Sequence, residues 1–315
     1  MSRRALVIIS ALAGLLLSGK VLAGTSTESV GETADRALIS PLVETSLSVR
    51  GHKGSKALGD SIWGFPINES DSAVGVEFTQ NNFFVTCGGT NPEVNAYDRN
   101  GNWRRRFPQF RSSGWGWRDL ASDGLHLYGS DDNMVTEFGA YGADYGDFPG
   151  PLNPNRALAY DPETDHFWTA SFTSPIYEFD RSGAVTNTYP NGYSIYGMAW
   201  DDASLDGPWL WVSAQTPDMV YQFNPVAGTY TGVSFPAASV PGGCCFTTEW
   251  DSTRAVLFYL AQSAPDYVIA YEIWVDTTPP APPWALTANG SNPSPWTNDS
   301  VFSVDWTNPP DQTGI

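Results

Sequence analysis

A short apolar segment that ends in an aromatic residue and an aspartate recurs along this chain. The copies are RALAYD at 156–161, IYGMAWD at 195–201, FTTEWD at 246–251, and the weaker RDLASD at 118–123 and VGVEFT at 74–79. They align on one column, which holds Glu77, Ala121, Ala159, Ala199 and Glu249. The members of this column lie 38 to 50 residues apart. An all-β repeat of about 40 to 45 residues is typical of propeller blades.

Each repeat continues with the same further strands. A second apolar pair follows the aspartate, and then an alternating strand ends in an aromatic and a polar residue, as in IYEFD at 176–180 and VYQFN at 220–224. Alternation places one face of such a strand against a neighbouring sheet. Turn signals such as Ser182-Gly183 precede a fourth strand. The sequence predicts an all-β fold, a five-bladed β-propeller with four strands per blade, and six blades are the alternative count.

The fifth repeat lacks a fourth strand of its own. SIWGFPI at 61–67, ahead of the first repeat, resembles a fourth strand. We expect it to pair with the fifth blade, because this pairing joins the two ends of the ring and hides two strand edges. The predicted propeller covers residues 61–273.

The N-terminal region predicts export. Residues 1–23 combine a basic Arg3-Arg4 pair, an apolar run too short for a membrane anchor, and Val21-Leu22-Ala23 as a cleavage site. Residues 24–60 are polar and are interpreted as a flexible lead-in. The predicted location is secreted or cell-surface.

The C-terminal region predicts a second module. Residues 274–283 include DTTPPAPP, a stiff and extended linker. Residues 284–315 contain one good strand, SVFSVDW at 300–306, and are interpreted as the start of an immunoglobulin- or fibronectin-like β-sandwich. Such a domain needs about 90 to 100 residues, so we expect residues 284–315 to be only the first part of the module.

The net charge bears on the class of binding partner, and the cysteines bear on possible disulfide bridges. The formal net charge is −18, which disfavours nucleic acid. The three cysteines are Cys87, Cys244 and Cys245. Export permits disulfides, so a bridge from Cys87 to Cys244 or Cys245 is predicted, and a strained Cys244–Cys245 bridge is the alternative.

Several motifs also carry a resemblance to a known group of proteins. SGWGWRDLA, NRALAYDPETDHFW, YSIYGMAWDD and CFTTEWD, together with the DTTPP linker, are similar to those of exported bacterial multidomain β-propellers. This group is mostly uncharacterised. The resemblance implies fibronectin- or immunoglobulin-like modules after the propeller and, in many members, a type IX secretion sorting domain. More distantly, the blades are similar to glutaminyl-cyclotransferase-like and streptogramin-lyase-like propellers.

The loops that enter the innermost strands predict a ligand site at one mouth of the central channel. Arg118 and Arg156 fall at equivalent places in adjacent blades, and guanidinium groups suit carboxylates, sulfates or phosphates. The polar and aromatic residues expected beside them are Trp115, Trp117, Asn155, Tyr193 and Tyr196. The alternative is structural, with Arg118 paired to Asp119 or Glu77 and Arg156 paired to Asp161.

Two further sets of acidic residues have alternative interpretations. Glu77 and Glu249 share a column in adjoining blades, so they are candidates for a catalytic acid and base, for cation binding, or for pairing with the arginines. Asp201, Asp202 and Asp206 are candidate calcium ligands, although aspartate is also a common hairpin-turn residue. No other metal or cofactor is predicted.

These observations favour a binding role. The first hypothesis is an exported, monomeric propeller that binds an extracellular small molecule, glycan or protein at its channel mouth, as an adhesion or scaffold module. The alternative is an extracellular hydrolase or lyase that acts on a saccharide or another small substrate in the channel. Fold alone does not decide between them.

Overall fold

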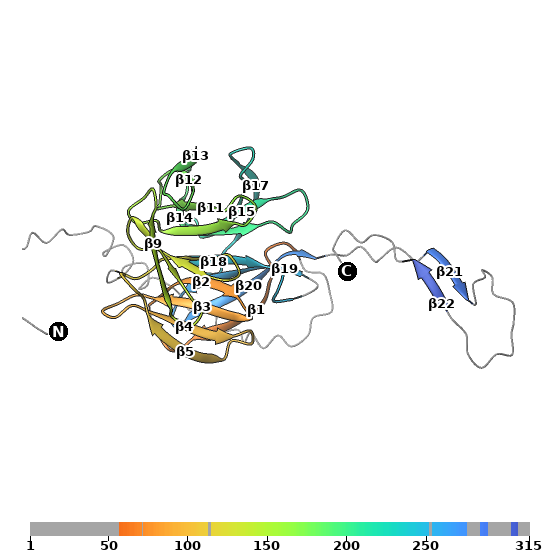
Figure 1. Cartoon of the computed structure of the whole chain (residues 1–315), viewed down its shortest axis with the longest axis horizontal. Coiled ribbons are helices and arrows are strands. Elements are labelled where there is room, and N and C mark those ends of the chain that lie inside the picture. The colour runs from red at the N-terminus through yellow and green to blue at the C-terminus, as the bar shows by residue number, and fades with distance from the viewer. Residues whose placement is uncertain are drawn as a thin grey trace, which may run out of the picture. The chain divides into compact units, whose positions relative to one another are not determined.

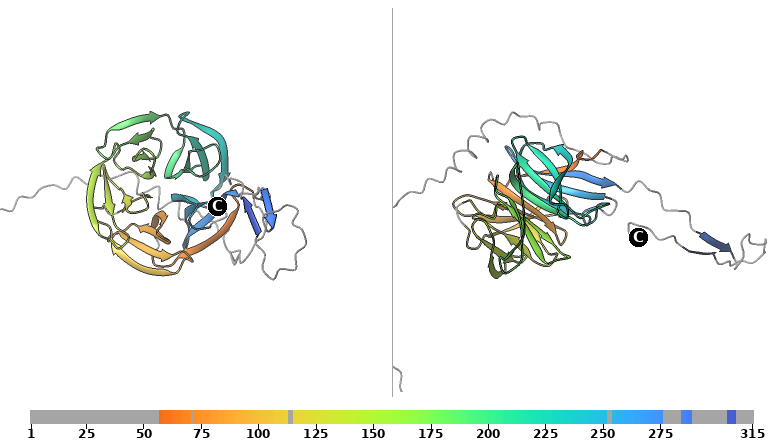
Figure 2. Two further views of the ribbon diagram at one scale, coloured as in Figure 1. Left: turned by 45° about the vertical axis from the view of Figure 1, so that its right-hand side comes forward. Right: turned by 90° about the horizontal axis from the view of Figure 1, so that it is seen from above.

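The computed structural model describes residues 57–70, 72–112, 115–251 and 254–275, and the two short strands β21 (Trp284–Ala288) and β22 (Val304–Thr307). These residues form five four-stranded antiparallel sheets and one two-stranded sheet. The five larger sheets follow one another around a ring (Figure 2). The predicted five-bladed β-propeller is confirmed, and the six-blade alternative is not.

The first four blades are each built from four consecutive strands. The first blade contains β2 (Ala73–Thr79), β3 (Asn82–Cys87), β4 (Glu93–Asp98) and β5 (Trp103–Pro108), and the second contains β6 (Leu120–Ser122), β7 (Leu127–Gly129), β8 (Met134–Phe138) and β9 (Asp144–Pro149). The third blade contains β10 (Ala157–Asp161), β11 (His166–Ala170), β12 (Ile176–Phe179) and β13 (Val185–Tyr189). The fourth contains β14 (Ser194–Asp201), β15 (Trp209–Gln215), β16 (Met219–Asn224) and β17 (Thr229–Pro236).

The fifth blade joins the two ends of the ring. It contains β18 (Val240–Thr247), β19 (Arg254–Gln262), β20 (Asp266–Val275) and β1 (Ser61–Ile67), in the spatial order β1-β20-β19-β18. β1 pairs antiparallel with β20, as predicted, and lies beside it in Figure 1. β20 continues two residues beyond the predicted end of the propeller at residue 273.

The aspartate of the repeat motif has a local structural role. In each of three blades, this aspartate ends the first strand of the blade or directly follows it. Its carboxylate accepts hydrogen bonds from backbone N–H groups of the next turn. Asp123 accepts from Leu125 and His126, and Asp161 accepts from Glu163. Asp201 accepts from Ala203 and Ser204 in the same way. The turn that leads to the second strand is thereby stabilised.

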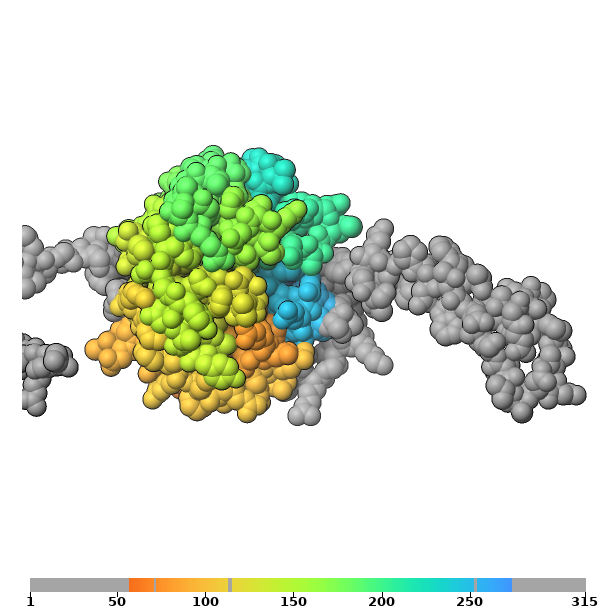
Figure 3. All heavy atoms as spheres, in the orientation of Figure 1, coloured from red at the N-terminus to blue at the C-terminus, as the bar shows by residue number. Residues whose placement is uncertain are grey.

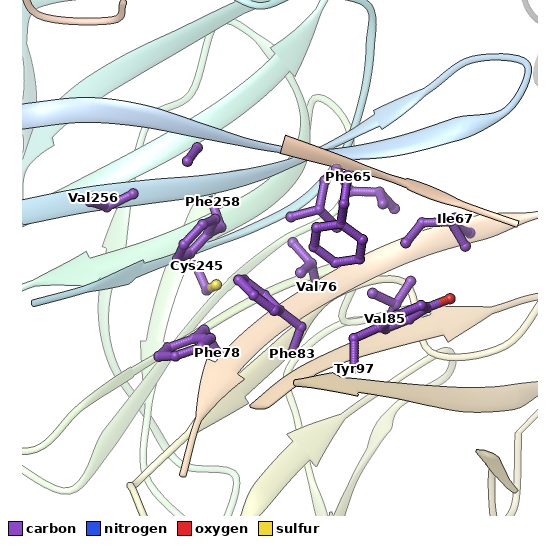
Figure 4. Packing of buried hydrophobic residues seen from close by; sticks show 14 of the residues in the cluster. Phe65, Ile67, Val76, Phe78, Phe83, Val85, Tyr97, Cys245, Val256 and Phe258 are labelled. Carbon is purple, nitrogen blue, oxygen red and sulfur yellow. The ribbon is translucent and has the colours of Figure 1, made fainter. Parts of the chain in front are cut away.

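Apolar side chains fill the space between neighbouring blades. One cluster joins the fifth blade to the first and includes Phe65, Phe83, Cys245 and Phe258, as Figure 4 shows. The rings of Phe83 and Phe258 meet edge to face, with centroids 4.6 Å apart. In the space-filling view, neighbouring blades lie directly against one another (Figure 3).

Some predictions fall on other parts of the chain. The predicted signal peptide, most of the lead-in and residues 276–283 of the linker lie outside the described residues. β21 and β22 pair antiparallel within the predicted sandwich module, which stays a prediction. Among the described residues, no helix is long and apolar enough to cross a membrane.

Candidate functional site

The wall of the central channel is made by the innermost strand of each blade. These strands are β2, β6, β10, β14 and β18, and each is the first strand of its sheet or, for β18, the last in spatial order. Each one contacts the innermost strands of both neighbouring blades. One edge of each innermost strand therefore pairs with no strand and faces the axis.

Glycine lets the strands approach one another midway along the channel. A Cβ atom added to Gly197 would lie 2.7 Å from the Cα atom of Gly243, and one added to Gly75 would lie 2.9 Å from the Cα atom of Asp119. Real Cβ atoms do not tolerate such distances. Gly75, Gly197 and Gly243 therefore occupy equivalent places in three blades, and any larger residue there would push the blades apart.

Asp119 closes the channel at this level. Its side chain is fully buried, and its Oδ2 atom accepts hydrogen bonds from the backbone N–H groups of Leu158, at 3.0 Å, and Met198, at 2.9 Å. A Cβ atom on Gly243 would collide with its Oδ1 atom. Burial raises the pKa of Asp119 well above its usual range, although the N–H donors oppose this effect.

Beyond Asp119, towards the ends of the innermost strands, the channel opens into a cavity of about 60 Å³. We call it the strand-end cavity. Residues from all five blades line it: Glu77, Leu120, Ala121, Ser122, Leu158, Ala159, Tyr160, Met198, Ala199, Trp200, Cys245 and Phe246. Because every blade contributes, the cavity lies on the propeller axis.

Glu77 is the acidic side chain of this cavity. It is only 8% exposed, and its Oε1 atom accepts a hydrogen bond from the backbone N–H of Phe78 at 2.8 Å. Burial raises the pKa of Glu77 to about 8, against the opposing effect of hydrogen bonds from Phe78 and from the Cys245 thiol. At neutral pH, the carboxyl group is therefore mostly protonated.

The structure changes the alignment that paired Glu77 with Glu249. β18 ends at Thr247, and Glu249 is exposed in the bend that follows. Cys245 lies two residues after Gly243, as Glu77 lies two residues after Gly75, and it lines the same cavity. The alignment fails here because β18 ends four residues before the motif aspartate Asp251, whereas β10 and β14 end at the corresponding aspartates, Asp161 and Asp201. Aligning the chain on that aspartate therefore selects Glu249, which lies four residues after Cys245, the structural equivalent of Glu77.

The opposite mouth, where the innermost strands begin, holds both predicted arginines. We call it the strand-start mouth. The guanidinium carbon of Arg156 lies 4.1 Å from the ring centre of Phe172 and 4.3 Å from that of Tyr196. The guanidinium carbon of Arg118 lies 4.9 Å from the ring centre of Trp115. Both arginines are buried, so aromatic packing holds their planes in place.

The contacts of the other residues predicted at this mouth are with residues other than the two arginines. Trp117 is buried and stacks on Phe138, 4.6 Å away, in the core between the first and second blades. Asn155 is buried and holds a loop, because its amide donates to the carbonyl oxygen of Asp132 and accepts from the N–H of Leu152. Tyr193 stacks on Tyr221 of β16 at 3.9 Å. The structure thus groups Tyr196 with Arg156, and Trp115 with Arg118.

The cysteines are three buried thiols in the structure, which contains no bridge between them. Cys87 and Cys245 belong to the cluster between the fifth and first blades, whereas Cys244 belongs to the cluster between the fourth and fifth. Successive residues of a strand point to opposite faces, which separates Cys244 from Cys245.

The three candidate calcium ligands do not share one environment. Asp201 is buried, and its Oδ2 atom accepts a hydrogen bond from Trp211 Nε1 at 2.9 Å, in addition to the turn contacts described above. Asp202 and Asp206 are exposed. Within the ranges that the structure describes, no group of three or more histidine, cysteine, aspartate or glutamate side chains is arranged to hold a metal ion.

Sequence reasoning missed three residues that shape the channel. The sequence predicts Asp119 only as a partner for Arg118, and Cys245 only as a disulfide candidate. An alignment on Gly75, Gly197 and Gly243, which lie at one level of the channel, would have found both residues. It places Asp119 at the position of these glycines and Cys245 at the position of Glu77. Phe172 has a φ angle of 46°, which is unusual for a bulky residue, and no sequence signal indicated that its ring would cover Arg156.

Comparison with known proteins supports the fold alone. No family model matches the chain, and no curated protein matches it in sequence. The crystal structure of Myxococcus xanthus glutaminyl cyclase is similar, with a TM-score of 0.53 and 14% identity over 69% of this chain and 97% of that chain. A chain of the mitotic checkpoint complex has a TM-score of 0.42 and 11% identity, over 64% of this chain and 77% of that chain.

Proposed function

We propose that this chain is an exported ligand-binding propeller that holds part of a small extracellular molecule in the strand-end cavity. The cavity carries the proposal, because all five blades line it and it contains a buried carboxyl group. Ligand sites are concave and combine apolar walls with a few placed polar groups. Three half-buried aromatic residues, Tyr160, Trp200 and Phe246, belong to this lining, most of whose surface is polar.

The strand-start mouth, with Arg118 and Arg156, is the second candidate site. Guanidinium groups there would suit a carboxylate or sulfate. Aromatic rings already cover guanidinium faces, and both side chains are buried. A ligand would therefore have to displace existing packing at this mouth. The strand-end cavity requires no such displacement, which is why we favour it.

An enzymatic role is the alternative function. A carboxyl group with a pKa of about 8 is suited to general acid or base catalysis near neutral pH. Glu249 is exposed beyond the end of β18, and the nearby Asp119 is fully buried and bound to backbone N–H groups, so neither is placed as the second carboxylate that most glycosidases use. Glutaminyl cyclase activity is not proposed, because a likeness at 14% identity concerns the fold.

A ligand screen with two matched variants tests the site. The full chain is screened by thermal shift against saccharides, amines, organic acids and calcium, and each hit is incubated to detect turnover. Phe246→Ala removes an aromatic wall of the strand-end cavity, and Trp115→Ala removes a half-buried ring at the opposite mouth. We expect a hit that is weakened at least about tenfold by Phe246→Ala and unchanged by Trp115→Ala.

The opposite pattern would move the site to the arginines and contradict the proposal. Turnover of a hit that depends on Phe246 would support the enzymatic alternative. If neither Phe246→Ala nor Trp115→Ala weakens any hit, or if there are no hits, ligand binding in the channel is contradicted.

A further inference from the structure

Among the residues that the structure describes, the lining of the strand-end cavity contains an acidic side chain and no basic one. Glu77 is the acidic side chain, and the lining includes no lysine, arginine or histidine. Two further acidic residues, Asp119 and Glu249, lie close enough to interact with Glu77, since the charge of Glu77 raises the pKa of Asp119 and the charge of Glu249 raises the pKa of Glu77. An anionic ligand would find no counter-ion in this lining, whereas a cation would find one.

The walls of the cavity also suit a cation. Tyr160, Trp200 and Phe246 line it, and two of these rings are held by neighbours. Trp200 stacks on Trp168 at 5.8 Å, and Tyr160 packs on Phe167 at 5.1 Å. These contacts occupy ring faces, and polar atoms make up most of the surface that lines the cavity. Polar acceptor atoms in such a lining stabilise a cation.

The wider surroundings add to this preference. The unpaired edges of five innermost strands face the axis, and backbone carbonyl groups along such edges are acceptors that a cation can use. The chain carries a formal net charge of −18, so its field raises the local concentration of cations.

We propose that the strand-end cavity binds the head group of a small organic ammonium cation, with Glu77 as its counter-ion. This inference rests on the proposed function, because it names the ligand class of the same site. At about 60 Å³, the cavity has room for a head group only, and the remainder of the ligand extends out of the mouth.

Binding of such a cation releases a proton. Without a bound cation, burial raises the pKa of the Glu77 carboxyl group to about 8. The titratable groups that interact with it are the thiols of Cys244 and Cys245 and the carboxyl groups of Asp119 and Glu249. The ammonium group needs the carboxylate form as its partner. The Glu77 proton therefore leaves to solvent as the cation enters, and charge in the cavity stays balanced.

Calorimetric titration of the full chain with choline tests this proposal. Choline carries a permanent charge and no titrating proton near its nitrogen, and 3,3-dimethylbutan-1-ol has the same shape without the charge. We expect choline to bind and the neutral alcohol not to bind. Affinity should rise about tenfold per pH unit below about pH 8 and level off above it, because only the ionised fraction of Glu77 is competent. Buffers of different ionisation enthalpy should report one proton released below that pH.

Two charge-removing variants locate the counter-ion. Glu77→Gln should abolish both choline binding and proton release, and Glu249→Gln should retain both, because Glu249 is exposed beyond the end of β18. If Glu77→Gln does not fold, the pH dependence of the unaltered chain still decides. Its affinity rises with pH if Glu77 is the counter-ion.

Three results would overturn the inference. Equal binding of the neutral alcohol would remove the role of charge. Affinity that falls as pH rises would mean that the protonated Glu77 donates to a ligand carbonyl group. Calcium chloride that displaces choline and binds more tightly at Glu77 would make the site one for an inorganic cation. If choline fails but a screening hit depends on Phe246, the proposed function stands and the ammonium assignment fails.

Discussion

At the scale of single residues, Asp119 is the group on which three blades converge. It precedes β6 of the second blade and accepts hydrogen bonds from backbone groups of β10 and β14 in the third and fourth blades. Buried N–H groups without an acceptor are destabilising, so this one side chain satisfies donors that the sheets themselves leave unpaired. Its raised pKa means that the side chain acts mainly as a neutral acceptor.

Substitution of Asp119 tests this role. Asp119→Asn keeps a neutral acceptor oxygen of the same shape, so we expect the free energy of unfolding to change by less than about 1 kcal/mol. Asp119→Ala leaves the N–H groups of Leu158 and Met198 without this acceptor, and we expect a loss of about 2 to 4 kcal/mol. Urea unfolding of both variants measures the difference. Equal losses in the two variants would mean that the charge of Asp119, and not its acceptor atoms, is what the fold requires.

At the scale of structural elements, the repeat motif describes a hairpin. The aspartate of the motif binds the backbone of the turn after the innermost strand, in the same way at Asp123, Asp161 and Asp201. Asp201 also accepts a hydrogen bond from Trp211, which anchors the hairpin to the second strand of its blade. These contacts explain why aspartate recurs at this place in different blades.

Substitutions of Asp201 test whether its carboxylate stabilises the turn or binds calcium. Asp201→Asn keeps an acceptor for Ala203 and Ser204, so we expect it to destabilise the protein by less than Asp201→Ala, which should cost about 1 to 3 kcal/mol. Thermal unfolding with calcium chloride and with a chelator completes the test. A melting temperature that rises with calcium in the unaltered protein but not in Asp201→Asn would contradict the turn interpretation and support the calcium site.

At the scale of the whole molecule, closure by β1 holds the two ends of the ring together. β1 precedes the first blade in sequence but belongs to the fifth blade in space, so the sheet cannot form without both ends of the propeller. Phe65 of β1 packs on Phe83 of β3 and Tyr97 of β4, with ring centroids 5.2 and 5.1 Å apart. β1 therefore contributes to the packing of the first blade as well as to the sheet of the fifth.

Truncation of Phe65 tests the closure. The ring of Phe65 is 5% exposed, so Phe65→Ala should lower the free energy of unfolding by about 3 to 5 kcal/mol. Leu125→Ala is the control, because Leu125 is 68% exposed in a hairpin, and we expect a change within about 0.5 kcal/mol. Denaturant unfolding provides both values. Similar small losses would show that the ring stays closed without the packing of β1.

The fold of this protein could be predicted largely from its sequence. Periodic apolar segments, hairpin signals and the displaced segment 61–67 determined the strands, the five blades and the closing strand, because each depends on local patterns repeated along the chain. The spacing of Arg118 and Arg156 likewise placed them at one mouth.

Only the tertiary structure decided what lies on the axis. Because β18 ends at Thr247, Glu249 lies beyond the channel wall, and Cys245 lines the cavity together with Glu77. The cavity, the buried state of Glu77 and the contacts of Asp119 arise where five blades converge. No single repeat contains these features, because they depend on distances between strands that are far apart in sequence.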